Sequence, residues 1–116
     1  MAWIGVLISA FVALEHIGFL LLEMFFWTKP VGLKVFNQTP EAAAASKTLA
    51  ANQGLYNGFL AAGLIWGIAT GRIDVLVFFL CCVVVAGVFG AATVKPRIFV
   101  VQALPALLAL GALFLR

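Results

Sequence analysis

The stretch that decides the fold is MAWIGVLISAFVALEHIGFLLLEMFFW, residues 1–27, an apolar run interrupted by Glu15, His16 and Glu23. It has the length and composition of a membrane-spanning helix. A charged group near the centre of a bilayer is costly, so such groups usually face a bundle interior, a partner or a water-filled cavity. The stretch therefore predicts a first transmembrane helix whose polar groups face away from lipid.

The composition of the whole chain points to the same class. Its 116 residues are 66% hydrophobic and 9% charged, and the mean hydropathy is +1.22. A soluble domain of this size leaves too much surface in water to hide so much apolar area. The apolar runs are about twenty residues long and lack the alternation of membrane barrel strands, so we expect an all-α integral membrane protein.

Four transmembrane helices are expected in a single domain, residues 1–116, packed as a four-helix bundle. The predicted spans cover about residues 2–27, 48–70, 75–93 and 98–115. No Lys or Arg precedes the first apolar run, which is also too long for a secretory signal. We therefore expect the first span to be retained.

Two local signals refine the second and fourth helices. Thr39, Pro40 and Glu41 predict a helix start, because threonine caps, proline fits the first turn and glutamate favours the positive end of the dipole. That helix is expected to continue unbroken to about Thr70, which makes it longer than the bilayer core is thick. Pro105 is expected to bend the last span and to free a carbonyl one turn earlier.

The basic residues predict an orientation. The first and third connections hold five of the seven Lys and Arg, and the other side holds two: Lys29, Lys34, Lys47, Lys95 and Arg97 against Arg72 and Arg116. Because cytoplasmic loops carry an excess of positive residues, connections 28–47 and 94–97 are predicted to be cytoplasmic. With a net charge of only +3, these residues indicate orientation and not a nucleic-acid surface.

A second polar stretch lies in the predicted second span, at Asn52-Gln53-Gly54-Leu55-Tyr56-Asn57-Gly58. Helical periodicity puts its amides and phenol on one face, and puts the ionisable groups of the first span in one stripe. Amides and phenols hold carboxylates or ligands in apolar surroundings. Two small glycines four residues apart would also permit a close approach of helices.

Polar residues of three predicted helices lie at about the same depth below the membrane surface. Glu23, Gln53 and Gln102 each lie five or six residues from a cation that marks the membrane surface. At 1.5 Å per residue this is about 7–9 Å below the same surface, which predicts a polar funnel built by three helices. The predicted ligand-binding or proton-relay residues are Glu15, His16, Glu23, Asn52, Gln53, Tyr56, Asn57 and Gln102.

Structural interpretations of the same residues stay open. Glu23 could extend to the interface, Glu15 could pair with His16, and the amides could simply join helices. One histidine and two glutamates of unknown geometry are a weak basis for a metal site, and we predict none. Cys81 and Cys82 are interpreted as small buried hydrophobic residues, since neighbours on a helix point apart.

Two motifs carry a resemblance to a known family. Glu15-His16-x6-Glu23-Met24-Phe25 and the segment 52–61, NQGLYNGFLA, resemble a bacterial family of small four-helix membrane proteins catalogued as domain of unknown function 1304. The resemblance covers essentially the whole chain, and the second motif is the more specific. It implies a four-helix integral membrane protein and transfers no activity. We expect the protein to be integral to the bacterial inner (plasma) membrane.

Our leading hypothesis is an intramembrane polar site that binds or moves a small amphiphilic or cationic molecule, with proton-coupled transport as one form. Glu15 and Glu23 would supply charge or exchange protons, and His16 would relay them. The competing hypotheses are an intramembrane isomerase or lyase that uses Glu and His as acid and base on a lipid-like substrate, and a structural subunit or assembly factor.

The sequence does not decide whether the protein is an enzyme, and it identifies no cofactor. The expected partners are the lipid bilayer and a small hydrophobic or amphiphilic molecule, with a homo-oligomer left open. No nucleic acid is expected.

Overall fold

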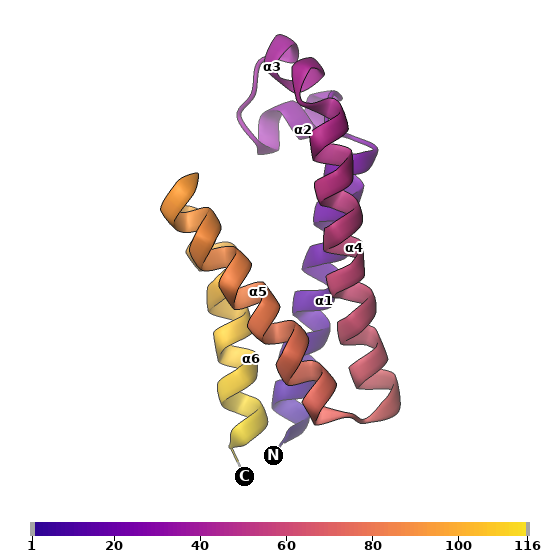
Figure 1. Cartoon of the computed structure of the whole chain (residues 1–116), viewed down its shortest axis with the longest axis vertical. Coiled ribbons are helices and arrows are strands. Elements are labelled where there is room, and N and C mark those ends of the chain that lie inside the picture. Colours follow the sequence, from indigo (N-terminus) through magenta and orange to yellow (C-terminus); the bar gives the residue numbers. More distant parts are fainter. Residues whose placement is uncertain (1, 116) are drawn as a thin grey trace. The chain divides into compact units, whose positions relative to one another are not determined.

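The computed structural model describes residues 2–115, and every regular element in them is helical. The order is α1 (Ala2–Met24), α2 (Pro30–Val35), α3 (Pro40–Ala45), α4 (Lys47–Thr70), α5 (Ile73–Thr93), the π-helix η1 (Phe99–Ala103) and α6 (Leu104–Phe114) (Figure 1). The predicted all-α class is confirmed.

Among the described residues, two helices are long and apolar enough to cross a membrane, Trp3–Met24 within α1 and Ile73–Thr93, which is α5. The helix α4 has 24 residues, about 36 Å at 1.5 Å per residue, but its amide side chains make it less apolar. The last apolar run, Phe99–Phe114, is shorter. The second predicted span, 48–70, and the fourth, 98–115, therefore stay predictions.

The chain divides into two compact units. One combines the first part of α1, up to Leu14, with the residues from Leu60 onward. The other is the continuous segment Glu15–Phe59. Both α1 and α4 contribute residues to both units.

In the first unit, α5 packs against η1 and α6 (Figure 1). The contact is close at Gly87, where a Cβ atom would lie 2.8 Å from the backbone nitrogen of Ala103. Aliphatic and small residues fill the core of this unit: Val12, Ala13, Leu64, Leu76, Leu80, Val83, Ala106, Ala109 and Leu113. Cys82 is half-buried but Cys81 is exposed, so the interpretation of both cysteines as buried was wrong for Cys81.

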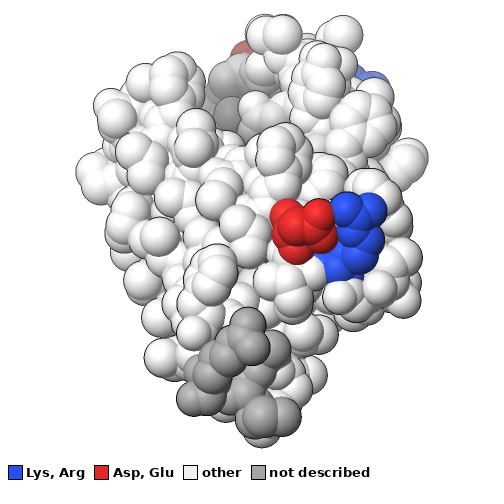
Figure 2. All heavy atoms as spheres, turned by 60° about the horizontal axis from the view of Figure 1, so that its bottom comes forward, with Lys and Arg blue, Asp and Glu red and all other residues white. Residues whose placement is uncertain are grey.

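The turn between α4 and α5, at the lower end of the view in Figure 1, contains a basic and an acidic side chain. Gly71 has a φ of +65°, a conformation that glycine adopts without strain. Arg72 then forms a 2.7 Å ion pair with Asp74, which raises the pKa of the guanidinium by hydrogen bonding and by charge. Figure 2, which brings this end forward, shows an acidic and a basic side chain in contact within a largely uncharged surface.

Pro105 changes the helix type at the start of α6. The residues directly before it form η1, and the Leu104 N–H donates to the carbonyl of Phe99, five residues back. Proline has no N–H, and its ring clashes with the carbonyl four residues earlier in a regular helix. A wider π turn relieves that clash, so the disturbance predicted at Pro105 takes the form of a π-helix.

In the second unit, the prediction of one unbroken helix from Thr39 to Thr70 was wrong, because α3 ends at Ala45 and α4 begins at Lys47. The start itself is confirmed: Thr39 Oγ1 accepts a hydrogen bond from the Ala42 N–H at 3.1 Å. At the break, Ser46 Oγ donates to the carbonyl of Ala42 at 2.9 Å. Such back-bonding by serine bends helices.

The first connection contains the short helix α2, for which the sequence analysis gave no prediction. Pro30 occupies the first turn of α2, where its missing N–H leaves no bond unmade. Asn37, with a φ of 51°, turns the chain after it. Upstream, α1 ends at Met24, three residues earlier than predicted.

Glycines set the contact between α1 and α4 in this unit. A Cβ atom at Gly54 would lie 2.7 Å from Met24 Cγ, and one at Gly58 would lie 2.5 Å from Leu20 Cδ1. Because the later residue of α4 meets the earlier residue of α1, the two segments run antiparallel. The small-residue pattern predicted from Gly54 and Gly58 is thus used for helix packing.

We expect G54A to lower the free energy of unfolding by about 1–3 kcal/mol, because the new methyl group would overpack the contact with α1. The matched control is G18A in α1, where nothing lies within 4 Å of an added Cβ. There alanine should be neutral or stabilising by up to about 1 kcal/mol. Unfolding in detergent, followed by circular dichroism, measures both, and equal stability of the two variants would contradict the close packing.

Candidate functional site

The buried carboxylate of Glu23, on the last turn of α1, is the centre of the candidate site. Its Oε2 accepts a hydrogen bond from Gln53 Nε2 at 2.7 Å, and its Oε1 accepts one from Asn57 Nδ2 at 2.5 Å. Only 4% of Glu23 is exposed. We call Glu23, Gln53 and Asn57 the Glu23 cluster.

The local structure explains why these three groups meet. Gln53 and Asn57 are one helical turn apart on α4, so their amides reach the same partner. Gly54 lies on the side of α4 that touches α1, 3.0 Å from Glu23 Cβ if a Cβ is added. Each carboxylate oxygen therefore receives one N–H donor, and the two amide oxygens are left to accept further bonds.

Glu15 and His16 lie two turns earlier on α1. His16 is fully buried, and its ring meets that of Phe19 edge-on with centroids 5.2 Å apart. Glu15 is half-buried, and its Oε1 is a buried atom with no hydrogen-bond partner among residues 2–115. The two glutamates of α1 thus differ, since one carboxylate is fully paired and the other is not.

The remaining predicted site residues are Asn52, Tyr56 and Gln102, which are not members of the Glu23 cluster. Asn52 and Tyr56 are exposed on α4, and the Tyr56 ring contacts that of Phe59 edge-on at 5.8 Å. Gln102 is half-buried in η1 and belongs to the other unit. Within residues 2–115, no three His, Cys, Asp or Glu side chains are close enough to hold a metal ion.

A hydrogen bond that the sequence analysis missed lies one turn beyond Glu23. Trp27 Nε1 donates to Ser46 Oγ at 3.1 Å, and the Trp27 ring packs on Phe36 with centroids 4.8 Å apart. Because α1 ends at Met24, Trp27 lies in the turn after the helix, and helical periodicity could not have predicted its partner.

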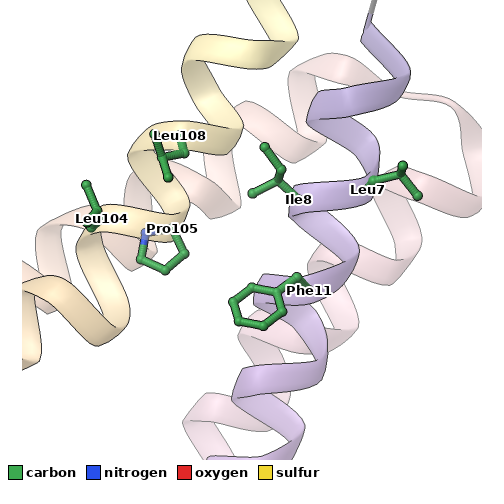
Figure 3. A pocket seen from close by; sticks show the side chains of 6 residues that line it. All are labelled: Leu7, Ile8, Phe11, Leu104, Pro105 and Leu108. Atoms are coloured by element: carbon green, nitrogen blue, oxygen red, sulfur yellow. The ribbon is translucent and has the colours of Figure 1, made fainter.

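A groove in the first unit is lined by apolar residues. The residues that line an open space of about 350 Å³ are Leu7, Ile8 and Phe11 of α1 and Leu104, Pro105 and Leu108 of α6 (Figure 3). This volume is at the lower end of the range for ligand pockets. None of the predicted site residues lines this groove. The Glu23 cluster is therefore a candidate site because of its hydrogen bonds to a buried carboxylate, and not because it lies in a large cavity.

The family model described as "protein of unknown function (DUF1304)" matches residues 10–114. The chain belongs to this family. It is also similar to the uncharacterized protein YpaA of Lactococcus lactis subsp. lactis (strain IL1403), with 30% identity over 118 residues, 98% of this chain and 99% of that protein. No solved structure matches. The resemblance drawn from the two motifs is confirmed, and the matched range includes every predicted site residue.

We expect a double-mutant cycle of E23Q and N57A to give a coupling of about 1–3 kcal/mol, because residues joined by a hydrogen bond to a carboxylate are not additive. The control is N52A on the same helix, an exposed amide whose removal should change stability by no more than about 0.5 kcal/mol. Unfolding of the four proteins in one detergent measures the coupling. Additive effects of E23Q and N57A would show that the bond to Asn57 contributes nothing.

Proposed function

We propose that the chain is a four-span integral membrane protein in which the Glu23 cluster, together with Glu15, binds a small cationic or amphiphilic molecule. Binding is linked to proton exchange, which allows coupled transport. The spans are α1, α4, α5 and the run from η1 through α6. Glu23 supplies the negative charge, and Gln53 and Asn57 orient it.

The distribution of polar and apolar residues supports the membrane part of this proposal. Trp3, Leu7, Phe11 and Leu14 follow one side of α1 and are 55–67% exposed. The buried polar or charged side chains are instead Ser9, His16, Glu23 and Asn57. Soluble monomers rarely expose contiguous apolar patches of this kind, whereas a lipid-facing helix must.

The paired carboxylate of Glu23 is the observation that carries the site. A carboxylate in a low-dielectric environment attracts a cation more strongly than the same group in water. Its two amide donors fix its position before any ligand arrives, which lowers the entropy cost of binding. Gln53 and Tyr56 are exposed on the same helix, α4, and a tyrosine face also binds cations.

Glu15 supports the link to protons. Its buried Oε1 has no donor among residues 2–115, and an unmade hydrogen bond at a buried polar atom costs about 1–3 kcal/mol. Either a proton or a donor group of the ligand would remove that cost. The two could therefore alternate at this carboxyl group, as coupled exchange requires.

The charge distribution supports a location in the bacterial inner membrane with connections 28–47 and 94–97 in the cytoplasm. Those connections hold five basic residues, whereas Arg72 is the basic residue at the opposite turn and is paired with Asp74. Arg116 lies outside the described residues. The positive-inside rule predicts that the side with the excess of basic residues is cytoplasmic.

One observation favours a second candidate, a structural role. Both oxygens of Glu23 are already hydrogen-bonded within the chain, so the cluster also acts as a join between α1 and α4. Polar groups between membrane helices stabilise helix pairs in this way. A purely structural cluster would leave ligand binding unchanged by any substitution that preserves folding.

We expect purified protein to bind the lipophilic cation tetraphenylphosphonium, and E23Q to weaken that binding at least about tenfold, equivalent to 1.4 kcal/mol, because it removes the charge and keeps the shape. Equilibrium dialysis measures the affinity. The anion tetraphenylborate has nearly the same shape and should not bind saturably. In proteoliposomes, addition of the cation should move protons in the wild type and not in E23Q.

The control is E41Q, the same substitution at an exposed glutamate of α3. It should bind the cation as the wild type does. Equal affinity of E23Q, E41Q and wild type, with all three folded, would refute the site and leave the structural role.

A further inference from the structure

The connection between α1 and α4 exposes apolar side chains where an aqueous loop would not. Phe25 and Phe26 follow α1, and Val31 and Val35 lie one turn apart on α2. All four are between 42% and 61% exposed. Four large apolar side chains exposed within eleven residues indicate a surface that meets something other than water.

Basic residues are interleaved with these apolar ones. Lys29 directly precedes α2 and Lys34 is in its last turn, and both are exposed. Between residues 25 and 47 the chain has three lysines and one acidic residue, Glu41, which gives a charge of +2. The surface formed by Phe25, Phe26, Lys29, Val31, Lys34 and Val35 is called the α2 surface below.

This surface is held in a fixed shape. Gly32 is buried, and any Cβ there would collide with the carbonyl oxygen of Phe26. Trp27 packs on Phe36 behind α2 and donates its hydrogen bond to Ser46. A surface ordered in advance loses little conformational entropy when it binds.

We propose that the α2 surface lies in the membrane interface and binds anionic phospholipid headgroups. The valines and phenylalanines enter the boundary between headgroups and acyl chains, and the two lysines extend to the phosphates. The inference rests on the membrane part of the proposed function and uses none of the residues of the Glu23 cluster.

Charge complementarity favours lipid over a protein partner. A short apolar helix flanked by lysines combines the two signals that bind the anionic cytoplasmic leaflet, insertion and electrostatic attraction. Each lysine near such a surface contributes about fivefold to the association constant. The predicted cytoplasmic side of connection 28–47 is the side that carries these lipids.

The test uses the full-length protein with W3F and W66F, which leaves Trp27 as the fluorescent residue beside α2. It is reconstituted in equimolar phosphatidylcholine and phosphatidylglycerol, with either one of the two lipids brominated. We expect brominated phosphatidylglycerol to quench Trp27 more strongly than brominated phosphatidylcholine. K29Q and K34Q should each reduce that preference about fivefold, in proportion to the lost charge.

The control is the double variant K95Q/R97Q, which removes two positive charges from the other basic connection, as many as K29Q and K34Q remove together. It should keep the preference of the wild type. A nitroxide at position 31, introduced by V31C with C81S and C82S, reports independently whether α2 contacts lipid.

The outcomes separate the two proposals. Equal quenching by both lipids, unchanged by K29Q and K34Q, overturns the headgroup assignment. Absence of quenching and of lipid contact at position 31, in protein that resists carbonate extraction, overturns the interfacial position and points to a protein partner or water. Release of the protein by carbonate overturns the membrane proposal itself.

Discussion

The carboxylate of Glu23 can be buried between α1 and α4 only because two amides donate to it and a glycine lets them reach it. A charged side chain costs about 2.5–3.5 kcal/mol at the centre of a membrane helix on insertion scales, which is an upper bound for Glu23 in the last turn of α1. Hydrogen bonds to a charged group contribute about 1.5–3 kcal/mol each, so the bonds from Gln53 and Asn57 are sufficient to offset that cost. The antiparallel register of Gly54 against Met24 follows from the same contact.

The sequence was sufficient to predict the features that depend on local periodicity. Hydropathy predicted the helical class and the extent of α5, and capping chemistry predicted the start at Thr39. Helical spacing put Gln53 and Asn57 on one side of α4, and the structure brings both to Glu23. These features could be read from the sequence because each is decided within a few turns of one helix.

The features that escaped prediction depend on contacts between distant residues or on unusual backbone bonds. The break at Ser46 coincides with a hydrogen bond from Trp27, nineteen residues away. The helix α2 packs through Gly32 against a backbone carbonyl, which no hydropathy pattern reports. At Pro105 the sequence indicated a disturbance, but it did not indicate that a π-helix would absorb it, in a segment that packs against α5.

The contrast between the two glutamates of α1 separates a binding site from a simple helix join. A join is complete when every buried polar atom is paired, and Glu23 meets that condition. Glu15 does not, because one buried oxygen has no donor within residues 2–115. A well-packed apolar residue would avoid that cost altogether, as apolar replacements of buried charged groups often do. We therefore infer that Glu15 is the carboxyl group at which a proton or ligand enters, and that Glu23 is the fixed charge that holds the ligand.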